Sequence, residues 1–257
     1  MSLSSLLGVI FGLILVVGAI ALATSNPLIY LDWHAFLIVF GGSIAAAFMG
    51  YHSQDVFTAF KAIGWMVKKP KSTREGLNTE IMRLIKWSYL VQQKGINALE
   101  NEIKTVAVND PILRYCMELV ITNHPPAELR TMMITAVESD FEHKTTAVPV
   151  LRNLGASAPS FGMIGTLVGL IAILNQMGSG AKNLPAVIGG GMSLALVATL
   201  YGVFFARMVF IPAANKLMQQ QETEHFRNLM VVEGLIMLAE KKTPRFMQDR
   251  LNSFLEP

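Results

Sequence analysis

Residues 150–177 read VLRNLGASAPSFGMIGTLVGLIAILNQM, and residues 185–212 read PAVIGGGMSLALVATLYGVFFARMVFIP. Each run is longer than the about 20 apolar residues with which a helix crosses a bilayer, and neither contains Asp or Glu. Glycine and alanine recur in both at four-residue spacing, which lets helices approach closely in lipid. The pair therefore predicts two adjacent membrane-spanning helices.

Two further apolar runs precede this pair. Residues 3–24 carry no charged side chain and are long enough to cross a bilayer, and a second run covers residues 35–51. A cleaved signal peptide is the alternative for the first run, because residues 21–23 look like a cleavage site. The basic residues that normally precede such a segment are missing. The chain therefore predicts four membrane-spanning helices.

The long stretch between the second and third runs is polar. Four lysines lie between residues 61 and 71, and basic residues so close to a span favour the cytoplasmic side. We therefore expect this stretch and both chain ends in the cytoplasm. Within the stretch Leu77, Ile81, Leu84 and Ile85 share one helix face, and no alternating strand pattern of any length occurs.

These patterns predict an all-α polytopic membrane protein in four parts. Residues 1–51 hold the first two membrane helices, and residues 52–149 form a helical cytoplasmic domain. Residues 150–212 hold the third and fourth membrane helices. Residues 213–257 form a cytoplasmic helical tail that continues the fourth helix.

Composition excludes several functional classes. Of the 257 residues 52% are hydrophobic and 15% are charged, against about 25% charged in a typical soluble domain. Basic cytoplasmic loops explain the net charge of +3, so we expect no nucleic-acid partner. The single cysteine, Cys116, excludes an internal disulfide and a cysteine zinc site. Without a phosphate-binding loop, metal-ligand spacing or catalytic triad, the sequence predicts neither an enzyme nor a cofactor.

The predicted membrane interior lacks the group that usually carries cations. An ion relay normally needs a titratable carboxylate within the membrane, and none of the four runs has Asp or Glu in its middle. Asp32 lies just before the second run, at the outer interface. If ions pass, another chain must supply the carboxylate.

Two threonines and two prolines stand out in the third and fourth runs. Thr166 and Thr199 fall near the middle of the bilayer on antiparallel helices, at about 1.5 Å per residue, and could line one polar strip. Each could instead bond only the carbonyl four residues earlier. Pro159 interrupts the hydrogen bonding of the third helix, and Pro212 marks the cytoplasmic end of the fourth. Both could also be static kinks.

These residues carry a resemblance to a known family. Residues 158–170, APSFGMIGTLVGL, resemble the third-span signature of MotA/PomA stator subunits of the flagellar motor, within the MotA/TolQ/ExbB superfamily. Further segments are similar to the same family: ATLYG at 198–202, FIP at 210–212, LD at 31–32 ahead of LIVFGGS at 37–43, and TPR at 243–245.

The resemblance implies an A subunit that forms a pentamer around two copies of a MotB- or PomB-like B subunit in the bacterial inner membrane. The B subunit would supply the ion-binding aspartate and a peptidoglycan anchor. Inward flow of Na⁺ or H⁺ would rotate the pentamer and drive the rotor protein FliG. By motif position, Pro159 and Pro212 match the family's functional prolines, and Thr166 and Thr199 match hydroxyls beside the ion path of sodium-type members. Asp32 matches an outer-loop acidic residue where ions enter.

The predicted rotor contact departs from the family. Glu100 falls on the usual acidic position, whereas the basic positions before it read Gln92 and Gln93, with Lys94 the nearest cation. We assign rotor contact to Lys94 and Glu100. Ala198 stands where sodium-type members often have a second threonine, but the two threonines that remain favour sodium over protons.

Several alternatives stay open. An energiser of an outer-membrane process resembling ExbB or TolQ would have three spans and an exterior N-terminus, unlike the adjacent runs at 3–24 and 35–51. The missing carboxylate disfavours an autonomous ion channel or transporter. A purely structural scaffold would not need Thr166 and Thr199, and the rotor could belong to a non-flagellar motor of the MotA type.

Overall fold

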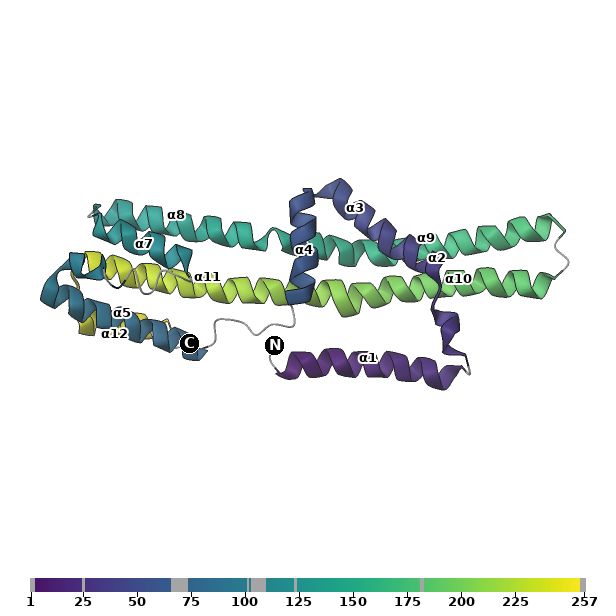
Figure 1. Cartoon of the computed structure of the whole chain (residues 1–257), viewed down its shortest axis with the longest axis horizontal. Helices are drawn as coiled ribbons and strands as arrows, with labels where there is room; N and C mark the ends of the chain where they lie inside the picture. The colour runs from purple at the N-terminus through teal and green to yellow at the C-terminus, as the bar shows by residue number, and fades with distance from the viewer. Residues whose placement is uncertain are drawn as a thin grey trace. The chain divides into compact units, whose positions relative to one another are not determined.

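The computed structural model describes residues 3–24, 26–65, 74–100, 102, 110–122, 124–180 and 183–254. Every regular element within these ranges is a helix and none is a strand, which confirms the all-α prediction (Figure 1). Three of the four lysines between residues 61 and 71 lie outside the described residues. The chain divides into two compact units: Met1–Lys69 with Thr146–Met218, and Pro70–Thr145 with Gln219–Pro257.

The first unit is built on a long antiparallel helix pair, α9 (Ala147–Gly178) and α10 (Leu184–Phe204), which lie side by side (Figure 1). η2, α3 and α4 pack against α9, and α2 packs against α10. The other elements of this unit are α1 (Leu3–Ala23), η1 (Pro27–Tyr30), α2 (Trp33–Phe36), η2 (Leu37–Gly41), α3 (Gly42–Gly50), α4 (Ser53–Trp65), η4 (Phe205–Phe210) and the start of α11 (Ile211–Ala239).

Local signals explain the turn between α9 and α10. Gly180 has φ +75°, a left-handed conformation that glycine adopts without steric penalty. The side chain of Asn183 accepts a hydrogen bond from the N–H of Ala186 at 3.4 Å and so caps α10, and Pro185 occupies the first turn. The sequence thus reverses the chain here and begins the fourth helix.

The fourth helix continues through Pro212 to Ala239. The segment η4 before Pro212 is π-helical, because the N–H of Ile211 bonds the carbonyl of Ala206, five residues back. Proline has no N–H, and its ring crowds the carbonyl four residues earlier, here that of Met208. A π turn widens the helix at this point, and the structure therefore accommodates Pro212 without ending the helix.

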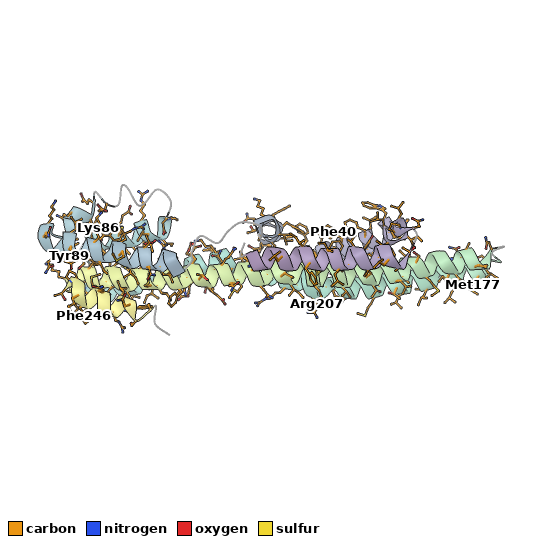
Figure 2. All side chains as sticks on the ribbon, turned by 90° about the horizontal axis from the view of Figure 1, so that it is seen from below. Phe40, Lys86, Tyr89, Met177, Arg207 and Phe246 are labelled. Carbon is orange, nitrogen blue, oxygen red and sulfur yellow. The ribbon has the colours of Figure 1, made fainter. Side chains whose placement is uncertain are left out.

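Three described helical stretches are long and apolar enough to cross a membrane: Pro27–Gly50, Pro126–Gly178 and Leu184–Ala239. They contain the second, third and fourth predicted spans. In the region of the first predicted span, α1 is helical, and its apolar part Ile10–Ala23 is shorter. Large apolar side chains project from α9 as far as Met177 (Figure 2).

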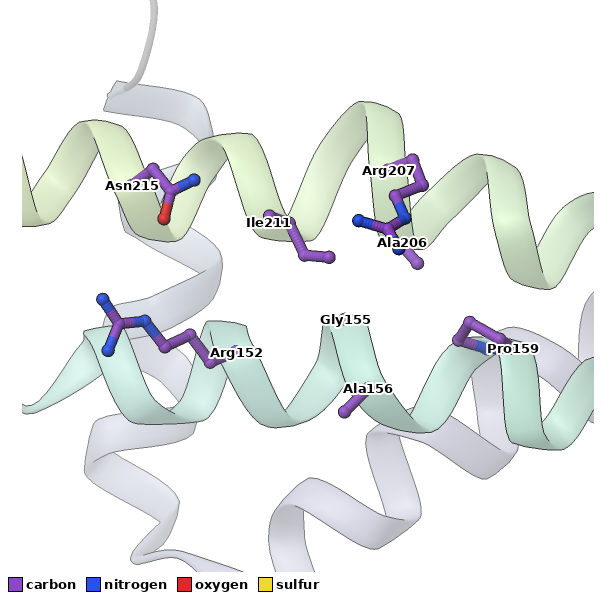
Figure 3. A pocket seen from close by; sticks show the side chains of 8 residues that line it. All are labelled: Arg152, Gly155, Ala156, Pro159, Ala206, Arg207, Ile211 and Asn215. Carbon is purple, nitrogen blue, oxygen red and sulfur yellow. The ribbon is translucent and has the colours of Figure 1, made fainter.

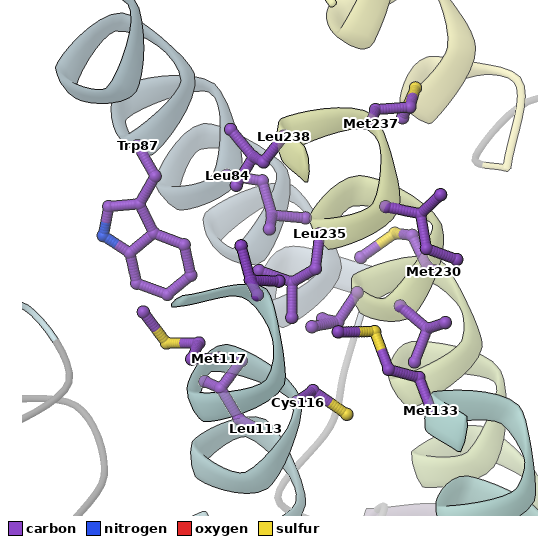
Figure 4. Packing of buried hydrophobic residues seen from close by; sticks show 14 of the residues in the cluster. Leu84, Trp87, Leu113, Cys116, Met117, Met133, Met230, Leu235, Met237 and Leu238 are labelled. Carbon is purple, nitrogen blue, oxygen red and sulfur yellow. The ribbon is translucent and has the colours of Figure 1, made fainter. Parts of the chain in front are cut away.

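The second unit contains α5 (Arg74–Lys94), η3 (Ile96–Ala98), α7 (Pro111–Ile121), α8 (Pro126–Thr145), the rest of α11 and α12 (Pro244–Asn252). Its core includes the fully buried Leu84, Trp87, Met117, Met230 and Leu235 (Figure 4). Leu77 and Ile81 are also buried, as the helical periodicity predicts.

An ion cluster ties three helical regions of the second unit together. Arg227 of α11 pairs with Asp110, and its other nitrogen lies 2.8 Å from Glu80 of α5. Burial lowers the pKa of Arg227, but the two carboxylates outweigh it and leave that pKa raised. Asp110 also caps α7 by accepting a hydrogen bond from the N–H of Leu113 at 3.1 Å. One arginine therefore bridges two carboxylates that are largely buried, and Arg83 lies 3.0 Å from the second oxygen of Glu80.

Candidate functional site

Small residues set the distance between α9 and α10. A Cβ added at Gly162 would lie 3.0 Å from the carbonyl oxygen of Ala198, and one at Gly169 would lie 2.5 Å from that of Gly191. At Gly202 it would lie 2.6 Å from the carbonyl oxygen of Ala158. The backbones touch along the pair, as expected where dispersion contacts drive association of helices in lipid.

This close approach brings the two predicted threonines together. The hydroxyl oxygens of Thr166 and Thr199 lie 2.7 Å apart, which is hydrogen-bonding distance. The hydroxyl of Thr166 also lies 3.2 Å from the carbonyl oxygens of Gly162 and Ala195. That of Thr199 lies 3.2 Å from the Ala195 carbonyl and 3.5 Å from the Gly162 carbonyl. We call these two hydroxyls and two carbonyls the hydroxyl cluster.

The structure therefore shows both expected kinds of threonine contact, within each helix and between the two helices. Each hydroxyl bonds the carbonyl four residues earlier in its own helix, and each also reaches across to the other helix. Two hydroxyl protons serve contacts among four oxygens, so lone pairs remain in the cluster. Oxygens of this kind are the ligands that an alkali cation prefers.

Asp32 is held against α10. Its N–H lies 3.3 Å from the hydroxyl of Tyr201, and its Oδ1 accepts hydrogen bonds from the N–H groups of His34 and Ala35 at 2.8 and 3.0 Å, capping α2. Tyr201 lies roughly 25 Å along α10 from its first residue, at about 1.5 Å per residue. Asp32 therefore lies close to the part of α10 that carries Thr199, and not near the first residue of α10.

The two prolines occupy different settings. Pro159 lies within α9 and cannot donate to the carbonyl of Gly155, and its Cα lies 3.0 Å from the Cβ that Gly202 would carry. Pro212 follows the π-helical η4. Both interrupt the ordinary hydrogen-bond ladder, so backbone carbonyls near each are released from it.

A pocket of about 480 Å³ lies between α9 and the segment from η4 into α11 (Figure 3). Its residues are Arg152, Gly155, Ala156, Pro159, Ala206, Arg207, Ile211 and Asn215. Neither arginine forms an ion pair with any residue that the structure describes. Two unneutralised guanidinium groups repel a resident cation. The hydroxyl cluster, and not this pocket, is the better candidate for contact with a cation.

The predicted rotor-contact residues lie in the second unit. Lys94 ends α5, and Glu100 follows η3; both side chains are exposed, as are Gln92 and Gln93. Gly95 between them has φ +80°, which ends the helix. Both charges are accessible to a partner.

Sequence reasoning missed Tyr201 as a contact of Asp32 and the π turn before Pro212. The hydrogen bond between Tyr201 and Asp32 joins residues far apart in the chain, and no local sequence pattern indicates it. Among the described residues, no group of His, Cys, Asp and Glu is arranged to hold a metal ion.

Fold and site together define a polytopic α-helical membrane protein whose closely packed hairpin encloses a polar cluster. The profile of the MotA/TolQ/ExbB proton channel family matches residues 104–228. Chemotaxis protein PomA of Vibrio alginolyticus is 30% identical over 99% of this chain and 96% of its own length. The structure of C. jejuni MotAB matches with a TM-score of 0.86 at 25% identity, over 100% of this chain and 96% of that one.

A second structure, the flagellar MotAB stator complex from Bacillus subtilis, shares the fold with a TM-score of 0.80 at 24% identity, over 96% of this chain and 94% of that one. The chain belongs to the MotA/PomA family of flagellar motor stator A subunits. These relatives are motor and channel subunits and not enzymes, in agreement with the sequence expectation.

Proposed function

We propose that this chain is the A subunit of an ion-driven stator that, with a B subunit, couples inward sodium flow to torque on the flagellar rotor. The observation that carries the proposal is the hydroxyl cluster, with Thr166 and Thr199 2.7 Å apart in a hairpin that has no carboxylate of its own. The cluster offers neutral oxygens to a cation, and the charge must come from a partner.

The partner would be a B subunit that supplies an aspartate beside the cluster and an anchor in the peptidoglycan. Exposed apolar side chains on α9 offer a contact surface to such a helix and to further copies of this chain: Leu167, Ile171 and Leu174 are 59%, 64% and 68% exposed. Structures similar to this chain are of MotAB complexes. The proposed assembly is a pentamer of this chain around two B subunits.

The proposed topology has four membrane helices, α1 among them, in the bacterial inner membrane. Both chain ends and residues 52–149 lie in the cytoplasm, in accord with the lysines that follow the second span. This places the connection between α9 and α10 toward the outer side.

Sodium is favoured over protons because of ligand number. A sodium ion that loses its hydration shell needs several oxygens, and a partner carboxylate supplies at most about two. The threonine hydroxyls and the carbonyls of Gly162 and Ala195 would supply others. A proton would need only the carboxylate of the partner. Asp32 would attract the cation as it enters.

Torque transfer would use the cytoplasmic part. Carbonyls released near Pro159 and Pro212 give their helices a second accessible bend, which ion occupancy on the partner would bias. Lys94 and Glu100 would contact the rotor protein FliG. The relatives that span the whole chain are motility proteins, which favours this function over a TolQ- or ExbB-like energiser.

The test is rotation in cells that lack their own stators and receive this chain with its B subunit. We expect the speed of a tethered bead to rise with sodium at fixed proton-motive force, and Thr166→Ala to weaken that response. Thr223→Ala is the matched control, because the hydroxyl of the half-buried Thr223 also bonds its own i−4 carbonyl, at 2.8 Å. Wild-type speed that ignores sodium would overturn the choice of ion. A response unchanged by Thr166→Ala would remove Thr166 from the ion path.

A further inference from the structure

The hydroxyl of Tyr201 bonds two backbone groups of the segment that leads into the second span. It donates to the carbonyl of Tyr30 at 2.5 Å and accepts from the N–H of Asp32 at 3.3 Å. Leu31, between these two residues, is 74% exposed. A single side chain of α10 therefore anchors a segment that would otherwise expose its backbone polar groups.

The same segment carries a carboxylate with a free oxygen. Asp32 and Asp55 are the acidic residues of the first unit, and Asp32 is the one attached to α10. Both capping bonds of Asp32 end on Oδ1, to which His34 Nδ1 is 3.7 Å away. Its Oδ2 accepts no hydrogen bond from the described residues, so one oxygen of a fixed carboxylate is left for a cation.

Tyr201 itself is no cation ligand. It lies two positions after Thr199, a rotation of about 200° around the helix, so the two side chains leave α10 on different faces. Its ring lies 6.1 Å from that of Phe205, and its hydroxyl is occupied by the Tyr30–Asp32 segment. Tyr201 can influence a cation only through Asp32.

We propose that Tyr201 is a positioning residue, which fixes the Asp32 carboxylate relative to the hydroxyl cluster. The inference rests on the proposed stator function. Tyr201 and Thr199 lie on the same rigid helix, α10. The distance between the Asp32 carboxylate and the hydroxyl cluster therefore stays constant while the Tyr201 hydroxyl is bonded to the Tyr30–Asp32 segment. Without that bond the segment loses its attachment to α10, and the carboxylate no longer concentrates cations at a fixed distance from the cluster.

The test replaces Tyr201 by phenylalanine, which keeps the ring and removes the hydroxyl. Bead speed is measured over a series of sodium concentrations, or over pH if wild type ignores sodium. We expect the half-saturating cation concentration to rise about threefold to tenfold, the range that corresponds to losing the net contribution of one hydrogen bond. Speed at saturating cation and the amount of complex in the membrane should match wild type.

Tyr51→Phe is the matched control. The Tyr51 hydroxyl also bonds a backbone carbonyl of a distant element, that of Pro149 at 3.3 Å, and lies away from Asp32 in the sequence. We expect Tyr51→Phe to leave the half-saturating concentration at its wild-type value.

A double variant shows whether Tyr201 acts through Asp32. Asp32→Asn keeps the capping oxygen and removes the charge. Adding Tyr201→Phe to it should shift the half-saturating concentration no further, because the group that Tyr201 positions is gone. An additive shift would overturn the inference, as would less Tyr201→Phe complex in the membrane with an unchanged half-saturating concentration. A wild-type complex that responds to neither cation would overturn the stator function itself.

Discussion

Replacing Gly202 by alanine adds one methyl group where α10 touches the backbone of α9. The new Cβ would lie 2.6 Å from the carbonyl oxygen of Ala158, 3.2 Å from its carbon and 3.0 Å from Cα of Pro159. Backbone atoms cannot turn away as a side chain can. The helices must separate instead, by roughly 0.8 Å to reach ordinary contact at 3.4 Å.

The separation acts on the hydroxyl cluster as well as on stability. Overpacking of this size destabilises by about 1–3 kcal/mol. Alanine also gains about 1 kcal/mol of helix propensity over glycine, which partly offsets the loss. Thr199 lies within one helical turn of Gly202, so the same shift would stretch the 2.7 Å contact between the hydroxyls toward roughly 3.5 Å, where little bonding remains.

Gly190→Ala supplies the control on the same helix. Apart from the adjoining backbone of α10, no atom of the described residues lies within 4 Å of the Cβ that Gly190 would carry, so this variant gains the propensity without the clash. We expect Gly202→Ala to be about 1–3 kcal/mol less stable than Gly190→Ala in micelle unfolding, and to rotate poorly in the bead assay. Equal stability of the two variants with wild-type rotation of Gly202→Ala would refute the close-contact reasoning.

Four further predictions concern single features. Pro159→Ala restores a backbone donor in α9 and should give complexes that assemble but turn slowly; wild-type bead rotation would leave the proline as a packing feature. Charge reversal at Lys94 and Glu100 together should reduce swimming while membrane assembly, checked by pull-down of the B subunit, stays intact. Arg227→Met leaves Asp110 without its cation and Glu80 with Arg83 alone, and should destabilise the second unit by about 3 kcal/mol, seen as faster amide exchange in α5 and α7. Burial raises the pKa of Cys116 from 9.0 to about 12, so maleimide labelling of the folded chain should stay slow at pH 8, and stability should fall as pH rises from 9 toward 12, because the unfolded chain ionises first.

The hydroxyl cluster was predictable because helix geometry fixes depth. Two spans of known direction and about 1.5 Å per residue are enough to place Thr166 and Thr199 at one level, and the small residues around them indicate that the helices touch. The buried positions of α5 were predictable for a similar reason, since the helical spacing of its apolar residues places them on one face.

Contacts between distant segments were not predictable. The bond from Tyr201 to the Tyr30–Asp32 segment depends on how α2 packs against α10, and each residue looks ordinary in its own neighbourhood. The sequence placed Asp32 before the second span but gave no sign that it touches α10. The ion cluster of Arg227 likewise joins charges that the sequence shows only as scattered polar residues.

The π turn of η4 determines which side of the fourth helix its buried positions occupy. The buried positions Ala198, Gly202, Ala206, Phe210 and Ala214 follow one another at every fourth residue, whereas an α-helix repeats at about 3.6. Each such step drifts about 40° around an α-helix, and one surplus residue in a π turn cancels much of that drift. A plain α-helix of the same length in place of η4 would swing the residues beyond it in the helix by about 100°. Phe210 would then turn from the interior toward the surroundings of the hairpin, so it is the π turn that keeps the last buried positions in line with the first.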